Sequence, residues 1–429
     1  MNKASLGMDN RMNSLPQVPD YITRLLPQVA GKPISAVKRE LGLREVIKLA
    51  SNENPLGPSE RAIEAMEQAV RDAHRYPDAG QYDLRLALAE HHGLAREEVV
   101  LGNGSSELID LLIRTYVDAN SHVLTSEGSF IAYKMSTESL GREFRTVPLT
   151  AEHGYDLDAM LEAMTPQTRL VFIANPNNPT GTMVGRDELQ RFIEKMDAKT
   201  GPTPPLLVLD EAYCEYIEPS LAPDSLAILK ERPGTVLLRT FSKAYGLAGL
   251  RCGYALACSE IVGHLNNVRS PFNVGSIAQI AAIAALADTP YLEATIATNH
   301  KNRKALEKSL VARGFSVTPS HANFLLVDLK CDGKRIFERL LQHGVITRPV
   351  GVYGLPNCLR ITVGTAAENA RLLDAVDAIF HVRPQRLVVT DRNLWRQMAR
   401  MARAQLRKLQ PNRIGAQRED QRKVQGIAQ

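Results

Sequence analysis

The feature that most constrains the fold is a lysine placed between two apolar runs, at positions 235–239 and 253–257. The first run leads directly to Ser242 and Lys243, and a glycine-rich loop with Arg251 separates this lysine from the second run. A surface loop would explain an isolated lysine, but an ammonium group between buried strands is costly without a partner. The position therefore indicates a chemical use for the amine, such as forming a Schiff base with a carbonyl.

Two other apolar runs also end in polar residues. Residues 170–174 lead into NPNNPTG at 175–181, and residues 206–209 lead into DEAY at 210–213. Apolar runs that alternate with helical patterns predict a mostly parallel sheet with both faces covered. In such sheets ligands collect at the carboxyl ends of the strands. Taken singly, NPTG fits a turn and a strand-end aspartate fits a helix cap, but together with the lysine they predict one site.

A third strand-end loop, GNGSSE at residues 102–107, precedes an apolar-periodic helix. Glycines at such a turn let backbone N–H groups close on an anion, and the helix N-terminus adds its positive end. The third glycine of a dinucleotide-binding fingerprint is missing, because Glu107 stands in its place. Together with Lys243, the loop is better interpreted as a cradle for a cofactor phosphate.

The stretch TFSKAYGLAGLRCGY, residues 240–254, resembles the cofactor-lysine motif of fold-type I pyridoxal 5′-phosphate (PLP) enzymes. Within them it is similar to the histidinol-phosphate aminotransferase family, as are SNENPLGPS at 51–59 and RYPD at 75–78. The similarity runs from about Tyr21 to Phe380. It implies an α/β fold, with a large doubly wound, mostly parallel sheet domain and a smaller α+β domain. The family usually has aspartate where this chain has Ser106, and we expect the change to be tolerated because backbone amides bind the phosphate.

The resemblance also implies how each residue would meet PLP. Lys243 would form the Schiff base and carry a proton, and Asp210 would keep the ring nitrogen protonated. The remaining contacts would be Gly104, Ser105, Ser106, Ser242 and Arg251 at the phosphate, Asn178 and Tyr213 at the phenolic oxygen, Phe130 on the ring face, and Tyr76 at the phosphate of a neighbouring subunit.

The implied substrate contacts are Arg360, Arg348 and Asn178. Arg360 matches the family's carboxylate-binding arginine, and a planar guanidinium pairs with a carboxylate through two parallel hydrogen bonds. Arg348 matches the position that binds the phosphate of histidinol phosphate. The predicted reaction converts histidinol phosphate and 2-oxoglutarate to imidazole-acetol phosphate and glutamate, a step of histidine biosynthesis.

Three alternatives remain open. The family usually reads Leu-x-Pro-Tyr where this chain has Gln28 in the last position, which leaves room for a phenylalanine or tyrosine aminotransferase. A threonine-phosphate decarboxylase is a same-fold rival. A non-catalytic PLP-binding sensor would normally carry a DNA-binding module before the fold, and the N-terminal arm is too short for one.

We expect four parts: an N-terminal arm and entry to the smaller domain (1–48), a large PLP-binding domain (49–290), a small C-terminal domain (291–382) and a basic tail (383–429). The tail carries twelve Lys/Arg and three Asp/Glu, a net +9, so the rest of the chain carries about −4 of the total +5. The positive charge therefore does not indicate nucleic-acid binding. Residues 391–410 predict a basic amphipathic helix, either packed on this protein or docked on an acidic partner.

The remaining features favour a cytoplasmic protein, and the resemblance, through Tyr76, implies a homodimer that acts on small molecules. The N-terminus has no apolar signal core, no apolar run is long enough for a membrane span, and the five cysteines form no CxxC pair. No metal-binding or P-loop motif occurs. His91 and His92 lie on a polar helix and are expected to face solvent.

Overall fold

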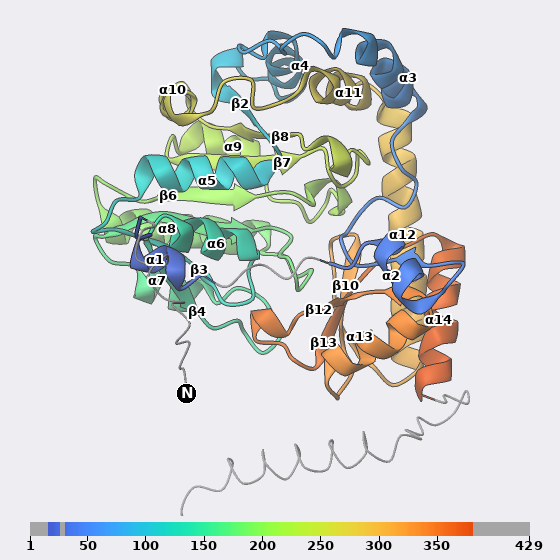
Figure 1. Cartoon of the computed structure of the whole chain (residues 1–429). Helices are drawn as coiled ribbons and strands as arrows, with labels where there is room; N and C mark the ends of the chain where they lie inside the picture. The colour runs from blue at the N-terminus through green and yellow to red at the C-terminus, as the bar shows by residue number, and fades with distance from the viewer. Residues whose placement is uncertain (1–15, 26–30, 381–429) are drawn as a thin grey trace, which may run out of the picture.

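The computed structural model describes residues 16–25 and 31–380. Its largest unit is a seven-stranded sheet in the order β2-β8-β7-β6-β5-β3-β4 (Figure 1). Neighbours from β7 to β4 pair in parallel, whereas β8 is antiparallel to both β7 and β2. The predicted mostly parallel sheet is therefore confirmed. The strands are β2 (Val99–Gly102), β3 (His122–Ser126), β4 (Glu143–Val147), β5 (Thr168–Ala174), β6 (Leu206–Asp210), β7 (Thr235–Thr240) and β8 (Gly253–Leu256).

Helices cover both faces of this sheet. Along β7, Leu237 packs into the core on one face, while Val236 and Leu238 pack into the core on the other, as the alternation of a strand requires. The second of these cores contains residues of α5 (Ser105–Tyr116), α6 (Ile131–Ser139) and α10 (Ser259–Val268). The first contains residues of α3 (Glu60–Ala69), α4 (Tyr82–His92), α7 (Leu157–Ala163), α8 (Arg186–Thr200), α9 (Ser225–Glu231) and α11 (Ser276–Leu286).

A smaller antiparallel sheet, in the order β12-β13-β10-β9, forms the lower part of the molecule in Figure 1. Its strands are β9 (Ser316–Thr318), β10 (Phe324–Asp328), β12 (Arg348–Pro349) and β13 (Cys358–Thr362). The long helix α12 (Thr289–Ala312) runs down the side of the molecule to this sheet and shares a core with α13 (Gly333–Gln342) and α14 (Ala366–Phe380). This core and the large-sheet cores are separate clusters, as a two-domain α/β fold requires.

The N-terminal segment joins the smaller unit. Strand β1 (Ile47–Lys48) pairs in parallel with β11 (Val345–Ile346), which directly precedes β12 in the chain. Residues that come before the large sheet in sequence are therefore attached to the smaller unit. Among the described residues, two helices precede β1, namely α1 (Asp20–Thr23) and α2 (Ile34–Leu41). The short 3₁₀ helices of the described part are Val70–Asp72, Arg96–Glu98, Cys214–Tyr216, Ala248–Leu250 and Gly351–Tyr353.

The expectation that both histidines of α4 face solvent is wrong for His92. Its side chain is buried, its Nε2 lies 3.0 Å from Tyr254 Oη, and Arg239 Nη1 lies 3.4 Å from its Nδ1. Burial lowers the pKa of His92 to about 3, so the ring is neutral. Leu84, Leu88 and His92 are spaced four residues apart and are all buried, so the helical periodicity of α4 places His92 on its apolar face, where it meets Tyr254 of β8.

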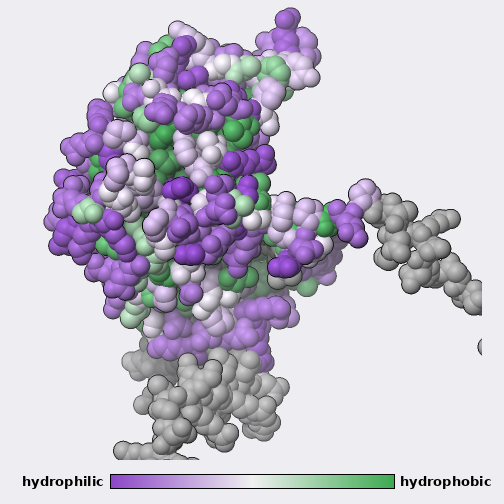
Figure 2. Space-filling model, turned by 90° about the vertical axis from the view of Figure 1, so that its left-hand side faces the viewer, coloured by the Kyte–Doolittle hydropathy of each residue, from purple (hydrophilic) through white to green (hydrophobic). Residues whose placement is uncertain are grey.

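The surface face in Figure 2 is mainly hydrophilic, with hydrophobic side chains in small scattered groups. Within residues 16–25 and 31–380, no single helix is long and apolar enough to cross a membrane, and α11 and α12 pass such a test only as a pair bent by 79°. Gln28 and the predicted helix 391–410 lie outside the described residues.

Candidate active site

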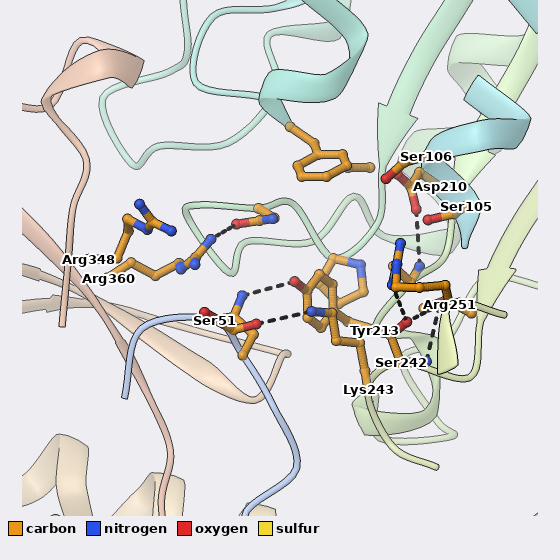
Figure 3. A pocket seen from close by; sticks show the side chains of 17 residues that line it. Ser51, Ser105, Ser106, Asp210, Tyr213, Ser242, Lys243, Arg251, Arg348 and Arg360 are labelled. Carbon is orange, nitrogen blue, oxygen red and sulfur yellow. Dashed lines mark hydrogen bonds between the residues drawn. The ribbon is translucent and has the colours of Figure 1, made fainter. Parts of the chain in front are cut away.

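A cavity of about 240 Å³ lies at the carboxyl ends of β5, β6 and β7, between the large and small sheets. Two arginines enter from one side, while serines and a third arginine lie at the other (Figure 3). The structure brings most of the predicted site residues into the wall of this cavity: Ser105, Ser106, Phe130, Asn178, Asp210, Tyr213, Ser242, Lys243, Arg251, Arg348 and Arg360.

Lys243 follows β7 and points into the cavity rather than into bulk water. Its Nζ donates a hydrogen bond to the carbonyl oxygen of Ser51, at 3.2 Å. Burial lowers the pKa of this amine to about 8, and the nearby charge of Arg360 contributes in the same direction. A lysine amine with this pKa is neutral in a substantial fraction of molecules near neutral pH, which is the form that attacks a carbonyl.

Asp210 is the last residue of β6, and its buried carboxylate has fixed partners. Tyr133 Oη donates to Oδ2 at 2.7 Å, and the backbone N–H of Ala212 donates to Oδ1 at 3.2 Å. Burial raises the pKa of Asp210 to about 6, and these two hydrogen bonds oppose the rise. The carboxylate is thus oriented before any ligand arrives and favours a cationic partner.

The end of the cavity at α5 is built to receive an anion. Gly104 has a φ of +74°, and a Cβ at this position would overlap the guanidinium of Arg251. Only glycine therefore lets the loop approach Arg251, although Gly104 itself does not line the cavity. Arg251 Nη1 donates to Ser242 Oγ at 3.3 Å, and α5 begins at Ser105 with its N-terminus beside this pair.

The opposite side is formed by Arg360 on β13 and Arg348 on β12, which are paired in the register of the two strands. Arg360 is buried, its Nη2 donates to the carbonyl oxygen of Ala50 at 2.7 Å, and its Nη1 donates to Asn178 Oδ1. Its Nε has no hydrogen-bond partner within the described residues. Arg348 likewise makes no hydrogen bond or ion pair to any described residue.

Tyr76 does not reach this cavity. Its side chain is 83% exposed and stacks on Phe272, with ring centroids 4.7 Å apart. The structure thus leaves Tyr76 outside the site of its own chain. Phe130, by contrast, lines the cavity at the start of α6 and meets Tyr133 edge to face, at 5.8 Å.

Comparison with known proteins decides the family. The family described as Aminotransferase class I and II matches residues 44–376. The chain belongs to this family. Among class I and II aminotransferases it is 47% identical over 366 residues to "Histidinol-phosphate aminotransferase" of an Anaeromyxobacter species, covering 85% of this chain and 99% of that protein. It is 45% identical to "Histidinol-phosphate aminotransferase 2" of Pseudomonas aeruginosa, covering 83% and 96%.

Solved structures of aminotransferases agree with the fold. The crystal structure of histidinol-phosphate aminotransferase from Sinorhizobium meliloti in complex with pyridoxal-5′-phosphate has a TM-score of 0.78 and 32% identity, covering 86% of this chain and 98% of that one. Aspartate aminotransferase from Thermus thermophilus with maleate has a TM-score of 0.73 at 22% identity, so this second similarity concerns the fold alone.

Two residues of this aminotransferase site were not anticipated from its sequence. Tyr133 lies on α6, whose other buried residue is Thr137, and nothing in the local sequence indicates a partner for its hydroxyl. Asn52 belongs to the SNENP segment, yet nothing in that segment indicated a partner for its side chain, which donates to Tyr213 Oη at 2.9 Å. Only the fold brings either residue to its partner.

Proposed function

We propose that this protein is a PLP-dependent aminotransferase that transfers the amino group of histidinol phosphate to 2-oxoglutarate. One observation carries the proposal, namely that a single cavity is lined by all the groups that the reaction needs. They are a lysine with a lowered pKa, an oriented carboxylate, a helix N-terminus suited to an anion, and two arginines with unpaired donors. The relatives named histidinol-phosphate aminotransferase support the same reaction. The reaction belongs to amino-acid biosynthesis, and we assign it to the cytoplasm.

The residues present fit PLP. The cavity wall carries four cationic side chains against the single carboxylate of Asp210, so it favours an anionic ligand such as a phosphate ester. The cradle at Gly104, which a Cβ would fill, suits that phosphate. When bound, PLP supplies an electron sink for the substrate's α-carbon.

Each residue then has a definite task. Lys243 would hold the carbonyl end of the cofactor through its amine and afterwards, as a free base, would move a proton at the substrate's α-carbon. Asp210, held by Tyr133, would stabilise a protonated ring nitrogen. The phosphate would be held by Ser105, Ser106, Ser242 and Arg251, the phenolic oxygen by Asn178 and Tyr213, and the ring face by Phe130.

The arginines bind the two substrates. Arg360 pairs with the carboxylate of 2-oxoglutarate or glutamate, and its unpaired Nε supplies an additional donor. Arg348 pairs with the phosphate of histidinol phosphate. Asn178, already hydrogen-bonded to Arg360, connects the substrate side to the cofactor side.

An aromatic amino acid is the second candidate donor, because Gln28 replaces the tyrosine that the family usually has there. The test is an assay of the purified protein with PLP and 2-oxoglutarate, comparing histidinol phosphate, phenylalanine and tyrosine as donors. We expect the highest kcat/KM for histidinol phosphate. A higher value for phenylalanine or tyrosine would establish the aromatic alternative, and no glutamate from any donor would reject the aminotransferase assignment.

We also propose a homodimer in which Tyr76 contacts the cofactor phosphate of the partner subunit. The support is an exposed aromatic pair, Tyr76 and Phe272, with Tyr82, Val70 and Val268 also exposed close by in sequence. Such an apolar surface is typical of a protein interface. The boundaries 49–290 and 291–382 remain our proposal for the two domains.

A further inference from the structure

A three-residue segment, Ala50–Asn52, contacts both sides of the cavity. The carbonyl oxygen of its first residue accepts from Arg360 Nη2 at 2.7 Å, and that of the second accepts from Lys243 Nζ at 3.2 Å. The side-chain amide of the third donates to Tyr213 Oη at 2.9 Å. The last contact is the only one of the three made by a side chain of this segment, so it is the one that a substitution can remove.

The orientation of the Asn52 amide is determined by Thr362 on β13. The backbone N–H of Asn52 donates to Thr362 Oγ1 at 2.9 Å, and the same hydroxyl donates to Asn52 Oδ1 at 3.2 Å. The hydroxyl has a single proton, which it gives to Oδ1 while accepting from the backbone. Because Oδ1 is thereby assigned as the acceptor, the NH₂ group of the amide faces Tyr213.

This orientation determines what the Tyr213 hydroxyl can do. An amide NH₂ group only donates, so Tyr213 Oη accepts from Asn52 and keeps its own proton for another acceptor. Burial raises the pKa of Tyr213 to about 12, and the proton is therefore retained at neutral pH. The ring lines the cavity, and the titratable groups around it are Arg360, Asp210, Tyr353 and Lys243, whose Nζ lies 5.6 Å from the ring centroid.

The backbone of Asn52 is held in an unusual conformation. Its φ is +56°, in the left-handed region, which asparagine adopts more readily than most residues but which is still uncommon. Its side chain is fully buried, and Asn323 Nδ2 donates to its carbonyl oxygen at 3.0 Å. Such conformations persist where the surroundings determine them, and they cluster at functional sites.

We propose that Asn52 is a positioning residue, which turns the hydroxyl proton of Tyr213 toward the phenolic oxygen of bound PLP. The inference rests on the proposed function, because it needs PLP in the cavity. A hydrogen bond donated to an anionic oxygen stabilises the charged form. Removing Asn52 lets the hydroxyl rotate away, so the deprotonated form of the bound cofactor loses stabilisation.

The test measures the pH midpoint of the visible absorption change of the PLP-loaded protein. Asn52→Gly removes the side chain but accepts a positive φ, whereas Asn52→Asp replaces the donor by an acceptor that draws the Tyr213 proton to itself. We expect Asn52→Gly to raise the midpoint by about half to one pH unit, the size of one hydrogen bond. Asn52→Asp should raise it at least as much. In a Tyr213→Phe background, Asn52→Gly should cause no further shift.

Two variants separate positioning from structure. Asn323→Ala removes a hydrogen bond to the Asn52 backbone but not the contact to Tyr213, so it should lower Tm and leave the midpoint unchanged. Thr362→Val removes the hydroxyl that orients the amide and should reproduce the shift of Asn52→Gly, which keeps the test available if Asn52→Gly fails to fold. An unchanged midpoint in the Asn52 variants, or an equal shift with and without the Tyr213 hydroxyl, would overturn the inference. A wild-type protein that gains no visible band with PLP would instead overturn the proposed function.

Discussion

The two sides of the cavity differ in how completely their polar groups are paired. On the sheet wall, formed by Asp210, Ser242, Lys243 and Arg251, the carboxylate, the guanidinium and the amine all have protein hydrogen-bond partners. On the arginine wall, formed by Arg348 and Arg360, one buried guanidinium nitrogen has none, and Arg348 has none among the described residues.

This difference in pairing fits two kinds of ligand, one that stays bound to the protein and others that bind and leave in each reaction cycle. A buried donor without a partner costs about 1–3 kcal/mol, and a ligand that pairs with the donor removes this cost. Under the proposed function, the sheet wall would hold the cofactor that stays bound. The arginine wall would offer its unpaired donors to the substrates that come and go. The following predictions ask whether the two walls respond differently to substitution.

The largest effect is expected on the sheet wall, from Lys243→Ala. Without the amine there is no covalent attachment of the cofactor and no base to move the substrate proton, so we expect kcat to fall below detection. The visible absorption of the attached cofactor should vanish, as measured by spectroscopy and a glutamate-formation assay. Lys195→Ala, which removes an exposed lysine paired with Asp158, is the matched control and should keep both signals. A Lys243→Ala protein with wild-type turnover would reject the proposed mechanism.

The next effect is expected on the arginine wall, from Arg360→Ala. Losing a buried guanidinium–carboxylate pair costs about 3–4 kcal/mol, or roughly 100- to 1,000-fold in kcat/KM for 2-oxoglutarate. Spectroscopic titration should show that PLP still binds, because all four side chains of the sheet wall are still present. Arg360→Lys keeps the charge but not the two-pronged geometry and should recover only part of the activity. Loss of PLP binding in Arg360→Ala would contradict the division into two walls.

A smaller and selective effect is expected from Arg348→Ala. A charge-assisted hydrogen bond to a phosphate contributes about 1.5–3 kcal/mol, so kcat/KM for histidinol phosphate should fall roughly 10- to 150-fold. The value for phenylalanine should change little, because this donor has no phosphate. Steady-state kinetics with both donors provide the measurement. Equal losses would indicate that Arg348 is structural or that the natural donor is aromatic.

The sequence predicted those parts of the site that lie next to buried strands. Lys243 and Asp210 each follow an apolar run, so position and chemistry coincide within a few residues. Tyr133 and Asn52 were missed because their partners lie 77 and 161 positions away. The antiparallel direction of β8 was also not anticipated, since alternation of strands and helices predicts parallel neighbours, whereas β7 and β8 are joined by a short loop and pair directly.

The pH dependence of cofactor uptake tests the sheet wall without any substitution. Burial, followed by the charge of Arg360, lowers the pKa of Lys243 from 10.5 to about 8, and the neutral amine is the reactive form. The rate of PLP attachment to the cofactor-free protein should therefore rise about tenfold per pH unit below 8 and level off above it. Stopped-flow absorbance from pH 6 to 10 measures this profile. A rate that still rises tenfold between pH 9 and 10 would show an amine with an ordinary lysine pKa.

The smallest effect is expected from ending the chain at Pro384, which should change kcat/KM by less than about twofold. Every described residue that lines the cavity lies between Ser51 and Arg360, so both walls as we define them consist of residues that the shortened chain keeps. The small-domain core is closed before that point, because Phe380 at the end of α14 is buried against Phe315, with ring centroids 5.1 Å apart. Truncated and full-length proteins should therefore share the same PLP absorption, kcat/KM and elution volume on gel filtration. A soluble truncated protein without activity would mean that residues 385–429 complete one of the walls, and its PLP absorption would identify which one, because only loss of the sheet wall should abolish that absorption.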